Sequence, residues 1–264
     1  MISQQDIIDA IESFAPPGLQ ESWDNTGWQL TPKNPATTEC TGALVCLDVT
    51  ESVVDEASRE GCNLIISHHP LIFKGLRSIT GATPSQRAVI TAIGRGIAVY
   101  SSHTALDSAP EGVSHELGLR LGLHDMHPLV EGNMPGAGLG VVGTLPAAIG
   151  APEFIEEVKR VYETDAVRVS ACGAPSTVST VALCTGSGGE FIADAIKAGA
   201  DVYVTSDVRY HDFLDYHRDI LIVDTGHYDS EKCTKSIFSK IISEKFPNFA
   251  VHISSSGYNP MKYV

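Results

Sequence analysis

The sequence has no run of the roughly 18 to 20 apolar residues that a membrane helix needs, and no cluster of basic residues. Its 18 Lys and Arg are outnumbered by 32 Asp and Glu, which gives a formal net charge of −14 at pH 7. Nucleic acid binding needs clustered cations against the phosphates, so a polynucleotide is not expected as a main partner. Residues 1–14 are acidic and amphipathic and lack the basic-then-apolar pattern of a signal peptide.

Several common motifs are also missing. The six cysteines form no C-x-x-C pair, and Cys46 and Cys184 lie in apolar runs where buried free thiols are common. We therefore expect a cytoplasmic protein. The chain contains no P-loop, nucleophile elbow or H-E-x-x-H. Residues 138–143, GLGVVG, match G-x-G-x-x-G, but Gly and Pro precede them and no helix pattern follows, so a dinucleotide site is not indicated.

What the sequence does contain is an alternation of short apolar runs with helical patterns, which predicts α/β units and a largely parallel sheet. The Gly/Pro-rich residues 127–146 interrupt this alternation. We expect them to join an N-terminal α/β lobe, 1–126, to a C-terminal α/β lobe, 147–264, and the two lobes may be one compact unit. The expected strands are 42–49, 63–67, 97–102, 166–170, 180–185, 201–206, 220–225 and 250–254, and the expected helices are 3–14, 50–60, 84–96, 151–163, 188–198, 209–217 and 230–245.

The second half of the chain resembles the first. Residues 43–69 align without a gap on 181–207, and residues 98–107 align on 222–231. Identities are few, so chance similarity is the alternative. Two α/β halves facing each other would bring polar strand ends to one crevice, where open α/β sheets bind ligands. The matched polar residues are His68 with Ser206, His69 with Asp207, His103 with His227, and Asp107 with Glu231.

The stretch NLIISHHPLIF, residues 63–73, ends an apolar strand in two adjacent histidines, His68 and His69. Adjacent residues of a strand point to opposite faces, so such a pair suits two neighbouring metal ions, or one ion and its substrate, better than one ion alone. We expect each histidine to bind a different ion. In isolation the pair is more typical of a turn with one hydrogen-bonded and one exposed imidazole.

Two further strand ends carry the same residue types. His103 and Asp107 follow one apolar run, and His227 and Glu231 follow another. If a helix begins near His227, its i, i+4 spacing places His227 and Glu231 on one face. Imidazoles and carboxylates together are typical ligands of divalent transition metals, and a pair of such ions can share a hydroxide.

The segment SDVRYHD, residues 206–212, adds weaker candidates. Asp207 and His211 are placed to support ligands or contact a substrate. The alternative for the two is a helix cap and a surface histidine.

Five segments together resemble the NIF-three-like family, the GTP cyclohydrolase 1 type 2 homologues: SWDNTGWQL, SHHPLIFKGLRSI, SSHTALD, SDVRYHD and DTGHYDSE. The resemblance implies two similar α/β lobes, a di-metal site in the cleft between them, a ring-shaped homohexamer, and the compact form without an inserted middle domain. Val141 departs from the family pattern, in which many members have Arg. By position the metal ligands would be His68, His69, Asp107, His227 and Glu231, with His103 lining the site.

The function that follows is a metal-dependent hydrolase of a small, nucleotide-like molecule. A hydroxide bridging two divalent ions (Zn, Fe, Mn, Co or Ni) would attack, and His103 or His211 would move protons. The alternative is a non-catalytic metal-binding hexameric module that stores or delivers ions or regulates a partner protein. An α/β protein without metal is the third reading.

Overall fold

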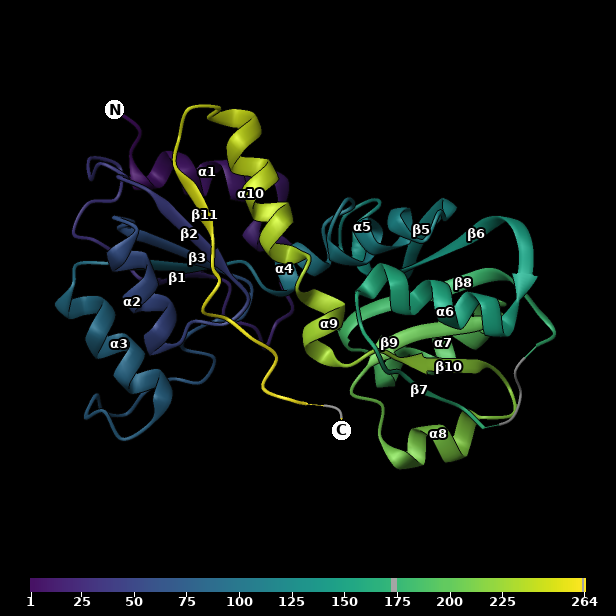
Figure 1. The fold of residues 1–264 in the computed structure, drawn as a ribbon. Coiled ribbons are helices and arrows are strands. Elements are labelled where there is room, and N and C mark those ends of the chain that lie inside the picture. Colours follow the sequence, from purple (N-terminus) through teal and green to yellow (C-terminus); the bar gives the residue numbers. More distant parts are fainter. Residues whose placement is uncertain (172–174, 263) are drawn as a thin grey trace. The chain divides into compact units, whose positions relative to one another are not determined.

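The structure, a computed structural model, describes residues 1–171, 175–262 and 264 (Figure 1). The chain forms two compact units. Unit 1 contains residues 1–106 and 233–260, and unit 2 contains residues 107–232 and 261–264. This division differs from the expected one, because the C-terminal helix and strand belong with the N-terminal part of the chain.

Unit 1 is built on a five-stranded sheet in the order β1-β4-β3-β2-β11. The central strands run parallel, as predicted, and only β1 is antiparallel to its neighbour β4. The elements of unit 1 are α1 (Gln4–Phe14), η1 (Pro17–Leu19), β1 (Gly27–Leu30), β2 (Ala43–Cys46), α2 (Glu51–Arg59), β3 (Leu64–Ser67), α3 (Pro84–Gly94), β4 (Ala98–Ser101), most of α4 (Thr104–Asp107), α10 (Thr234–Lys245) and β11 (Val251–Ile253).

The helices of unit 1 begin where the sequence supplies caps. The Thr50 side chain accepts from the backbone N–H of Val53 at the start of α2, and Thr83 caps α3 in the same way ahead of Pro84. Such caps satisfy backbone donors that the first helical turn leaves without partners. This is why the boundaries of α2 and α3 could be predicted closely.

Helices cover both faces of this sheet (Figure 1). Because side chains alternate along a strand, Leu44, Ile65 and Val99 pack with α2 and α3 in one buried cluster. On the other side, the hydroxyl of the buried Tyr100 donates to Glu12 of α1 at 2.8 Å, and α1 contacts α10. Contacts on both faces of the sheet therefore fix β3 and β4, the strands that lead to the predicted histidines.

Unit 2 contains a six-stranded sheet in the order β5-β6-β8-β9-β10-β7. Here only β8, β9 and β10 are parallel to one another, so the sheet is mixed. The elements of unit 2 are α5 (Val113–Arg120), β5 (His124–Glu131), β6 (Gly138–Gly150), α6 (Ala151–Tyr162), β7 (Arg168–Val169), β8 (Thr177–Ser187), η2 (Gly189–Phe191), α7 (Ile192–Lys197), β9 (Val202–Ser206), α8 (Tyr210–Tyr216), β10 (Leu221–Asp224) and α9 (His227–Glu231).

The Gly/Pro-rich residues 127–146 are part of this sheet and not a junction. They form most of an antiparallel pair, β5 and β6. The glycines are required by close packing: a Cβ on Gly138 would lie 2.1 Å from the carbonyl oxygen of Val130, and Gly140 has a φ of +67°. Glycine here permits two backbones to approach, whereas the sequence pattern alone suggested a break.

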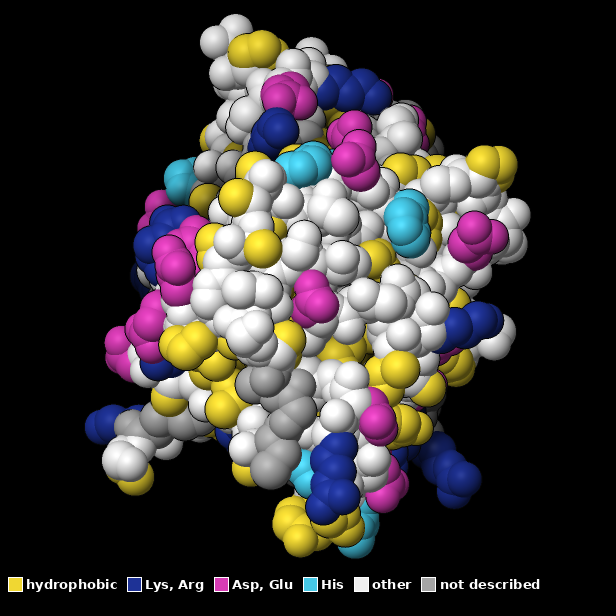
Figure 2. All heavy atoms as spheres, turned by 90° about the vertical axis from the view of Figure 1, so that its right-hand side faces the viewer, with side chains coloured by type: hydrophobic (Ala, Val, Ile, Leu, Met, Phe, Trp, Pro, Cys, Tyr) yellow, Lys and Arg dark blue, Asp and Glu magenta, His cyan; other side chains and the backbone are white. Residues whose placement is uncertain are grey.

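The core of unit 2 lies under α7. Ala182, Tyr203 and Ile222 of the three parallel strands pack with Ile192 and Ala195 of that helix. Helices α5 and α6 contact β6 and β8. On the face of unit 2 turned to the viewer in Figure 2, acidic and basic side chains are interspersed, and neither sign forms a continuous area.

The internal repeat predicted from the sequence is visible in the topology. Strands β2, β3 and β4 are parallel neighbours in unit 1, and β8, β9 and β10 are parallel neighbours in unit 2. The aligned segments supply these strands and a helix between the first two of each set, α2 or α7. The fold class is therefore α/β with two related sheets.

Two further features bear on the sequence predictions. Within the described residues, no helix is both long and apolar enough to cross a membrane. The five described cysteines are buried and have free thiols, and Cys172 lies outside the described residues. Burial raises the pKa of the Cys62 thiol to about 11 and that of Cys40 to about 12, which keeps both protonated and unreactive at neutral pH.

Glu56 of α2 fastens the C-terminal segment to unit 1. Its buried carboxylate accepts hydrogen bonds from the Ser254 hydroxyl, from the N–H and hydroxyl of Ser255, and from the N–H of Ser256, at 2.6–3.0 Å. Burial alone would raise the pKa of this carboxyl, but the hydrogen bonds outweigh burial and lower the pKa from 4.5 to about 2. The ionised form is therefore the one that holds residues 254–256.

We expect Glu56→Gln to lower the stability of unit 1 by about 2–3 kcal/mol at pH 7, because an amide replaces a charged acceptor and presents N–H groups to serine donors. The loss should appear as a lower thermal midpoint. The wild-type advantage should be complete above pH 4.5 and vanish as the pH falls toward 2, where the wild-type carboxyl is itself protonated. The control is Glu51→Gln, on the same helix as Glu56, which removes an exposed ion pair with Arg87 of α3. It should change stability by less than about 1 kcal/mol. Equal midpoints for the two variants would contradict this assignment.

Candidate metal centre

In unit 1 the three histidines of the predicted site follow the ends of β3 and β4. Ser67 and Ser101 end these strands side by side, and their buried hydroxyls are 2.7 Å apart. The Ser67 hydroxyl also donates to the carbonyl oxygen of His69 at 2.8 Å. This seryl pair fixes the backbone from which His68 and His69 leave the sheet.

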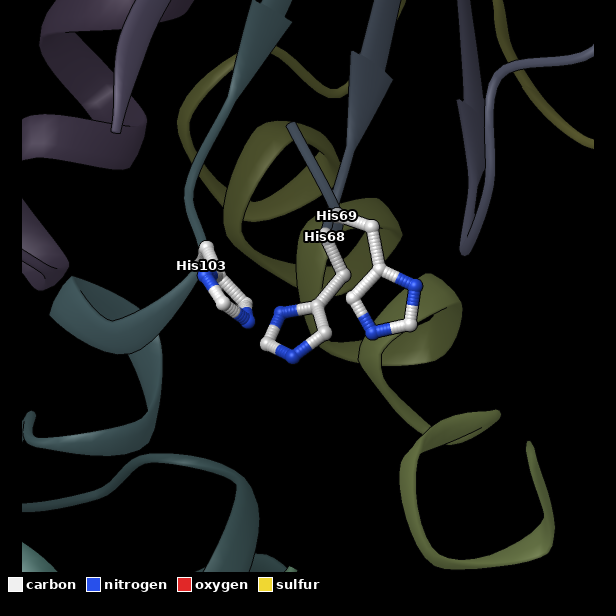
Figure 3. A group of neighbouring side chains, drawn as sticks. All are labelled: His68, His69 and His103. Atoms are coloured by element: carbon white, nitrogen blue, oxygen red, sulfur yellow. The ribbon is translucent and has the colours of Figure 1, made fainter. Parts of the chain in front are cut away.

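The imidazole rings of His68, His69 and His103 gather in one place, as Figure 3 shows. Their centroids are 5.1, 5.2 and 5.6 Å apart, and one nitrogen of each ring lies within 4.8 Å of the others. The expectation that His68 and His69 diverge to opposite faces is therefore wrong. Strand geometry ends at Ser67, and both histidines lie in a bend where the alternation rule no longer holds.

Each of these rings is anchored through Nδ1. His69 Nδ1 lies 2.8 Å from Asp48, His103 Nδ1 lies 2.7 Å from Asp24, and His68 Nδ1 lies 3.1 Å from the carbonyl oxygen of Ser102. Because carboxylates and carbonyls accept, Nδ1 carries the proton in each neutral ring, and the Nε2 lone pair becomes the metal-binding position. Histidines that bind metals in proteins are almost always oriented in this way.

Asp24 is the centre of the hydrogen-bond network around His103. Its carboxylate also accepts from the hydroxyl and N–H of Thr104 at 2.6 and 3.0 Å and from the hydroxyl of Thr26 at 3.0 Å. Burial by itself raises the pKa of Asp24, but the hydrogen bonds from His103 and Thr104 outweigh it, and the pKa lies well below its usual range. Asp24 is therefore ionised at neutral pH, and its carboxylate orients His103.

In unit 2 the short helix α9 carries the second set of candidate ligands. It begins at His227 and ends at Glu231, as the i, i+4 spacing predicts, and His227 Nε2 lies 3.0 Å from the buried Glu231 carboxylate. The other ring nitrogen, Nδ1, lies 2.8 Å from Asp207, which occupies a left-handed backbone position with φ 55°. His227 thus repeats the pattern of His69 and His103.

Glycine 186 makes room for the Glu231 carboxylate. A Cβ on Gly186 would lie 2.2 Å from Glu231 Oε1, and its φ of +67° is one that glycine adopts without strain. The backbone N–H of Gly186 donates to Ser230 at 3.0 Å, and its carbonyl oxygen accepts from Ser206. The β8 end is therefore held against α9 at a fixed distance.

Asp107, the last residue of α4, is half-buried in unit 2. Burial raises the pKa of the Cys184 thiol, and the negative charges of Asp107 and then Glu231 raise it further. The two carboxylates proposed as ligands therefore both lie within electrostatic range of one buried thiol.

His211 is the one predicted site residue that the structure leaves outside these groups. It is exposed on α8 and contacts the ring of Tyr210 at 5.4 Å. Among the described residues, no group of potential metal ligands includes it.

Sequence reasoning missed two residues of this site, Asp24 and Asp48. Both are carboxylates distant in sequence from the histidines that they orient, so spacing gave no signal for either. Asp207 was a candidate for a supporting role, and its contact with His227 agrees with that role.

Comparison with known proteins identifies the family. The model for Duf34/NIF3 (NGG1p interacting factor 3) matches residues 2–260. The chain belongs to the Duf34/NIF3 family. A protein of Clostridium acetobutylicum named GTP cyclohydrolase 1 type 2 homolog is 31% identical to this chain over 98% of both sequences. The NIF3 homolog of Schizosaccharomyces pombe is 33% identical over 84% of this chain and 82% of its own.

Solved structures agree with this assignment. A hypothetical protein of Staphylococcus aureus aligns with a TM-score of 0.88 and 26% identity, covering 100% of this chain and 99% of the other. The resemblance inferred from the five sequence segments is thus confirmed. In this Duf34/NIF3 protein, each unit contains histidine or carboxylate side chains that could bind a metal ion.

We expect Gly186→Ala to weaken metal binding about 10- to 100-fold, the usual cost of disturbing groups that support a metal ligand, because the new methyl group displaces the Glu231 carboxylate. Metal titration of the apo protein monitored by calorimetry measures the effect. Gly150→Ala is the control: this position, also in unit 2, has an ordinary φ of −62°, and an added Cβ would lie 3.9 Å from Cδ of Pro152. Unchanged affinity in Gly186→Ala, with circular dichroism like that of the wild type, would contradict the role of Gly186.

Proposed function

We propose that this Duf34/NIF3 protein binds two divalent transition-metal ions and is a metal-dependent hydrolase of a small molecule. The observation that supports the proposal most directly is the orientation of three histidines. Each of the three rings has Nδ1 hydrogen-bonded to an aspartate carboxylate. The pairs are His69 with Asp48, His103 with Asp24, and His227 with Asp207. Hydrogen bonds of this kind fix the tautomer and raise the basicity of Nε2 toward a metal.

The donor set fits transition metals. With Nδ1 of His227 protonated, its neutral ring presents an Nε2 lone pair 3.0 Å from the Glu231 carboxylate. A cation between these two acceptors, a proton or a metal ion, stabilises the contact, and a metal ion could bind both atoms. Imidazole with carboxylate suits Zn, Fe, Mn, Co and Ni, and excludes a strong preference for Ca or Mg, which favour oxygen ligands alone.

Neither unit by itself supplies a full ligand set for two ions. Unit 1 offers the imidazoles of His68, His69 and His103, and unit 2 offers His227 with the carboxylates of Asp107 and Glu231. Even with water completing the coordination, three side chains are too few to hold two four-coordinate ions. We therefore propose a di-metal site that uses His68, His69, Asp107, His227 and Glu231.

In the proposed reaction, the ions would supply Lewis-acid polarisation of the substrate and an activated water. His103 would move the proton. Its Nδ1–H donates to Asp24, so Nε2 is the atom that accepts a proton, and the Asp24 anion stabilises the resulting imidazolium. His211 is a second candidate for proton transfer. It is the weaker of the two because it is exposed on α8 and belongs to none of the ligand groups among the described residues.

A relative's name, GTP cyclohydrolase 1 type 2 homolog, suggests a nucleotide-like substrate and hydrolytic ring opening. That chemistry adds water to an electrophilic ring carbon, which agrees with a metal-activated water. The non-catalytic alternative, a module that stores or delivers metal or regulates a partner, uses the same ligands and differs only in turnover.

We expect the reconstituted wild-type protein to contain about two transition-metal ions per chain, and the Asp107→Ala and Glu231→Ala variants to contain about one or fewer. Elemental analysis after dialysis measures this. Glu153→Gln, an exposed carboxylate on α6, is the control and should keep both ions. Fewer than one ion per wild-type chain would reject the metal site.

Turnover separates the two functions. Metal-loaded protein is incubated with purine nucleotides and other ring-containing metabolites, and ring opening is followed by absorbance and mass spectrometry. The hydrolase predicts a product that disappears in both ligand variants. Tight metal binding without turnover on any compound would favour the non-catalytic module, and turnover that survives metal loss in both variants would reject the mechanism.

The assembly is also a proposal. We expect a homohexamer of about six times the 28.1 kDa chain mass in multi-angle light scattering at micromolar concentration. A monomer or dimer under these conditions would contradict the ring-shaped hexamer that the family resemblance implies.

A further inference from the structure

Two exposed aromatic side chains lie beside the histidine cluster of unit 1. The ring of Trp23 contacts the rings of Phe73 and His103 with centroid separations of 6.1 Å in both cases, and Phe73 lies 6.2 Å from His103. The interplanar angles are 65°, 71° and 82°, so the three rings meet edge to face. We name this group of Trp23, Phe73 and His103 the aromatic corner.

Within the aromatic corner, the side chains of Trp23 and Phe73 are exposed to solvent. Trp23 has 60% of its surface accessible and Phe73 has 46%, whereas the side chain of His103 is only 15% exposed. Aromatic rings of this size usually bury most of their area in a core. In an edge-to-face contact, one ring uses only its edge. A face of that ring is then available for parallel stacking with another flat group.

The position of Trp23 is fixed by the same residues that orient His103. Trp23 immediately precedes Asp24, whose carboxylate binds both His103 and Thr104. The next residue, Asn25, donates from its side-chain amide to the carbonyl oxygen of Ile72 at 2.6 Å, which ties this segment to the loop that carries Phe73. The two aromatic residues are therefore held beside His103 by polar contacts on both sides.

We propose that Trp23 and Phe73 form a stacking surface for a flat heteroaromatic ring, and that this surface selects the substrate of the site. The proposal rests on the proposed function, because it assigns a substrate class to the same site. A ring stacked on Trp23 would lie next to His103, the group proposed to move a proton. Stacking on an aromatic side chain favours any flat ring over a saturated one.

The charge of the loop defines the ligand further. Residues 70–83 contain Lys74 and Arg77, both exposed, and no Asp or Glu, in a chain whose net charge is −14. This segment therefore tolerates an anionic substituent where most of the surface would repel it. The ligand class is a flat nitrogen heterocycle that carries an anionic group, such as a purine nucleotide.

The test uses metal-free full-length protein, so that ring binding is measured without metal or turnover. The probes are adenosine monophosphate and ribose 5-phosphate, which carry the same phosphate and differ in the ring. We expect the nucleotide to bind at least 10-fold more tightly in calorimetric titration and to quench tryptophan fluorescence. Trp23→Ala should weaken nucleotide binding about 10-fold, within the range for losing one base–aromatic stack, and leave ribose 5-phosphate binding unchanged.

Three variants make the result specific. Trp23→Phe should restore affinity to within about 3-fold of the wild type while losing the fluorescence quench. Trp28→Phe, at a ring that packs on Tyr100 at 5.6 Å, should retain both affinity and quench, which assigns the signal to Trp23. Tyr258→Ala removes another exposed aromatic residue of unit 1 and should have no effect.

Equal affinity for the two probes, or unchanged nucleotide affinity in Trp23→Ala, would overturn the proposal. So would a Trp23→Ala variant whose only change is its oligomeric state in light scattering, because the exposed rings would then be a contact between copies of the chain. Failure of metal binding is detected separately by elemental analysis. The two proposals can therefore fail independently.

Discussion

The hydrogen bond between an aspartate and Nδ1 of a histidine is the interaction on which the candidate site depends. It occurs three times, at His69, His103 and His227, with Nδ1–oxygen distances of 2.7–2.8 Å. Each contact sets the tautomer, directs Nε2 and retains a negative charge behind the ring. Without it an imidazole at a strand end would rotate freely, and its lone pair would have no fixed direction. The serine hydroxyls, the threonine hydroxyls and the asparagine amide around these rings serve to keep the aspartates or the backbone in place.

Much of the scaffold could be predicted from the sequence because local rules and tertiary packing agree there. Thr50 and Thr83 are N-cap residues, and helices begin directly after them. The apolar runs that begin at Leu64 and Ala98 form buried parallel strands. The Gly-rich residues around Gly138 were misread, because glycine marks both chain breaks and places where backbones touch. Only the tertiary structure decides between these two uses. The hydrophobic periodicity of the sequence likewise did not predict that α10 and β11 pack in unit 1 with the N-terminal residues.

The candidate site was predictable in its ligand types and less so in its geometry. Strand ends rich in His, Asp and Glu indicated His68, His103, His227 and Glu231, and the helical spacing from His227 to Glu231 is confirmed. The prediction that His68 and His69 point to opposite faces was wrong, because the chain bends after Ser67 and no longer has the alternation of a strand. Asp24 lies 79 residues from the histidine that it orients, and no pattern within one sequence connects positions so far apart. The role of a residue such as Asp24 can therefore be recognised only from the three-dimensional structure.

The discontinuous composition of unit 1 has a consequence for synthesis of the chain. Unit 2 is almost wholly continuous, and residues 107–232 contain all of its strands. Unit 1 lacks β11, α10 and the serines that bind Glu56 until residues 233–260 have left the ribosome. Unit 2 can therefore acquire its fold first, while residues 1–106 wait as a partly formed sheet with an open edge at β2. Because β11 pairs with β2 at that edge, the sheet of unit 1 is complete only once residues 251–253 are available.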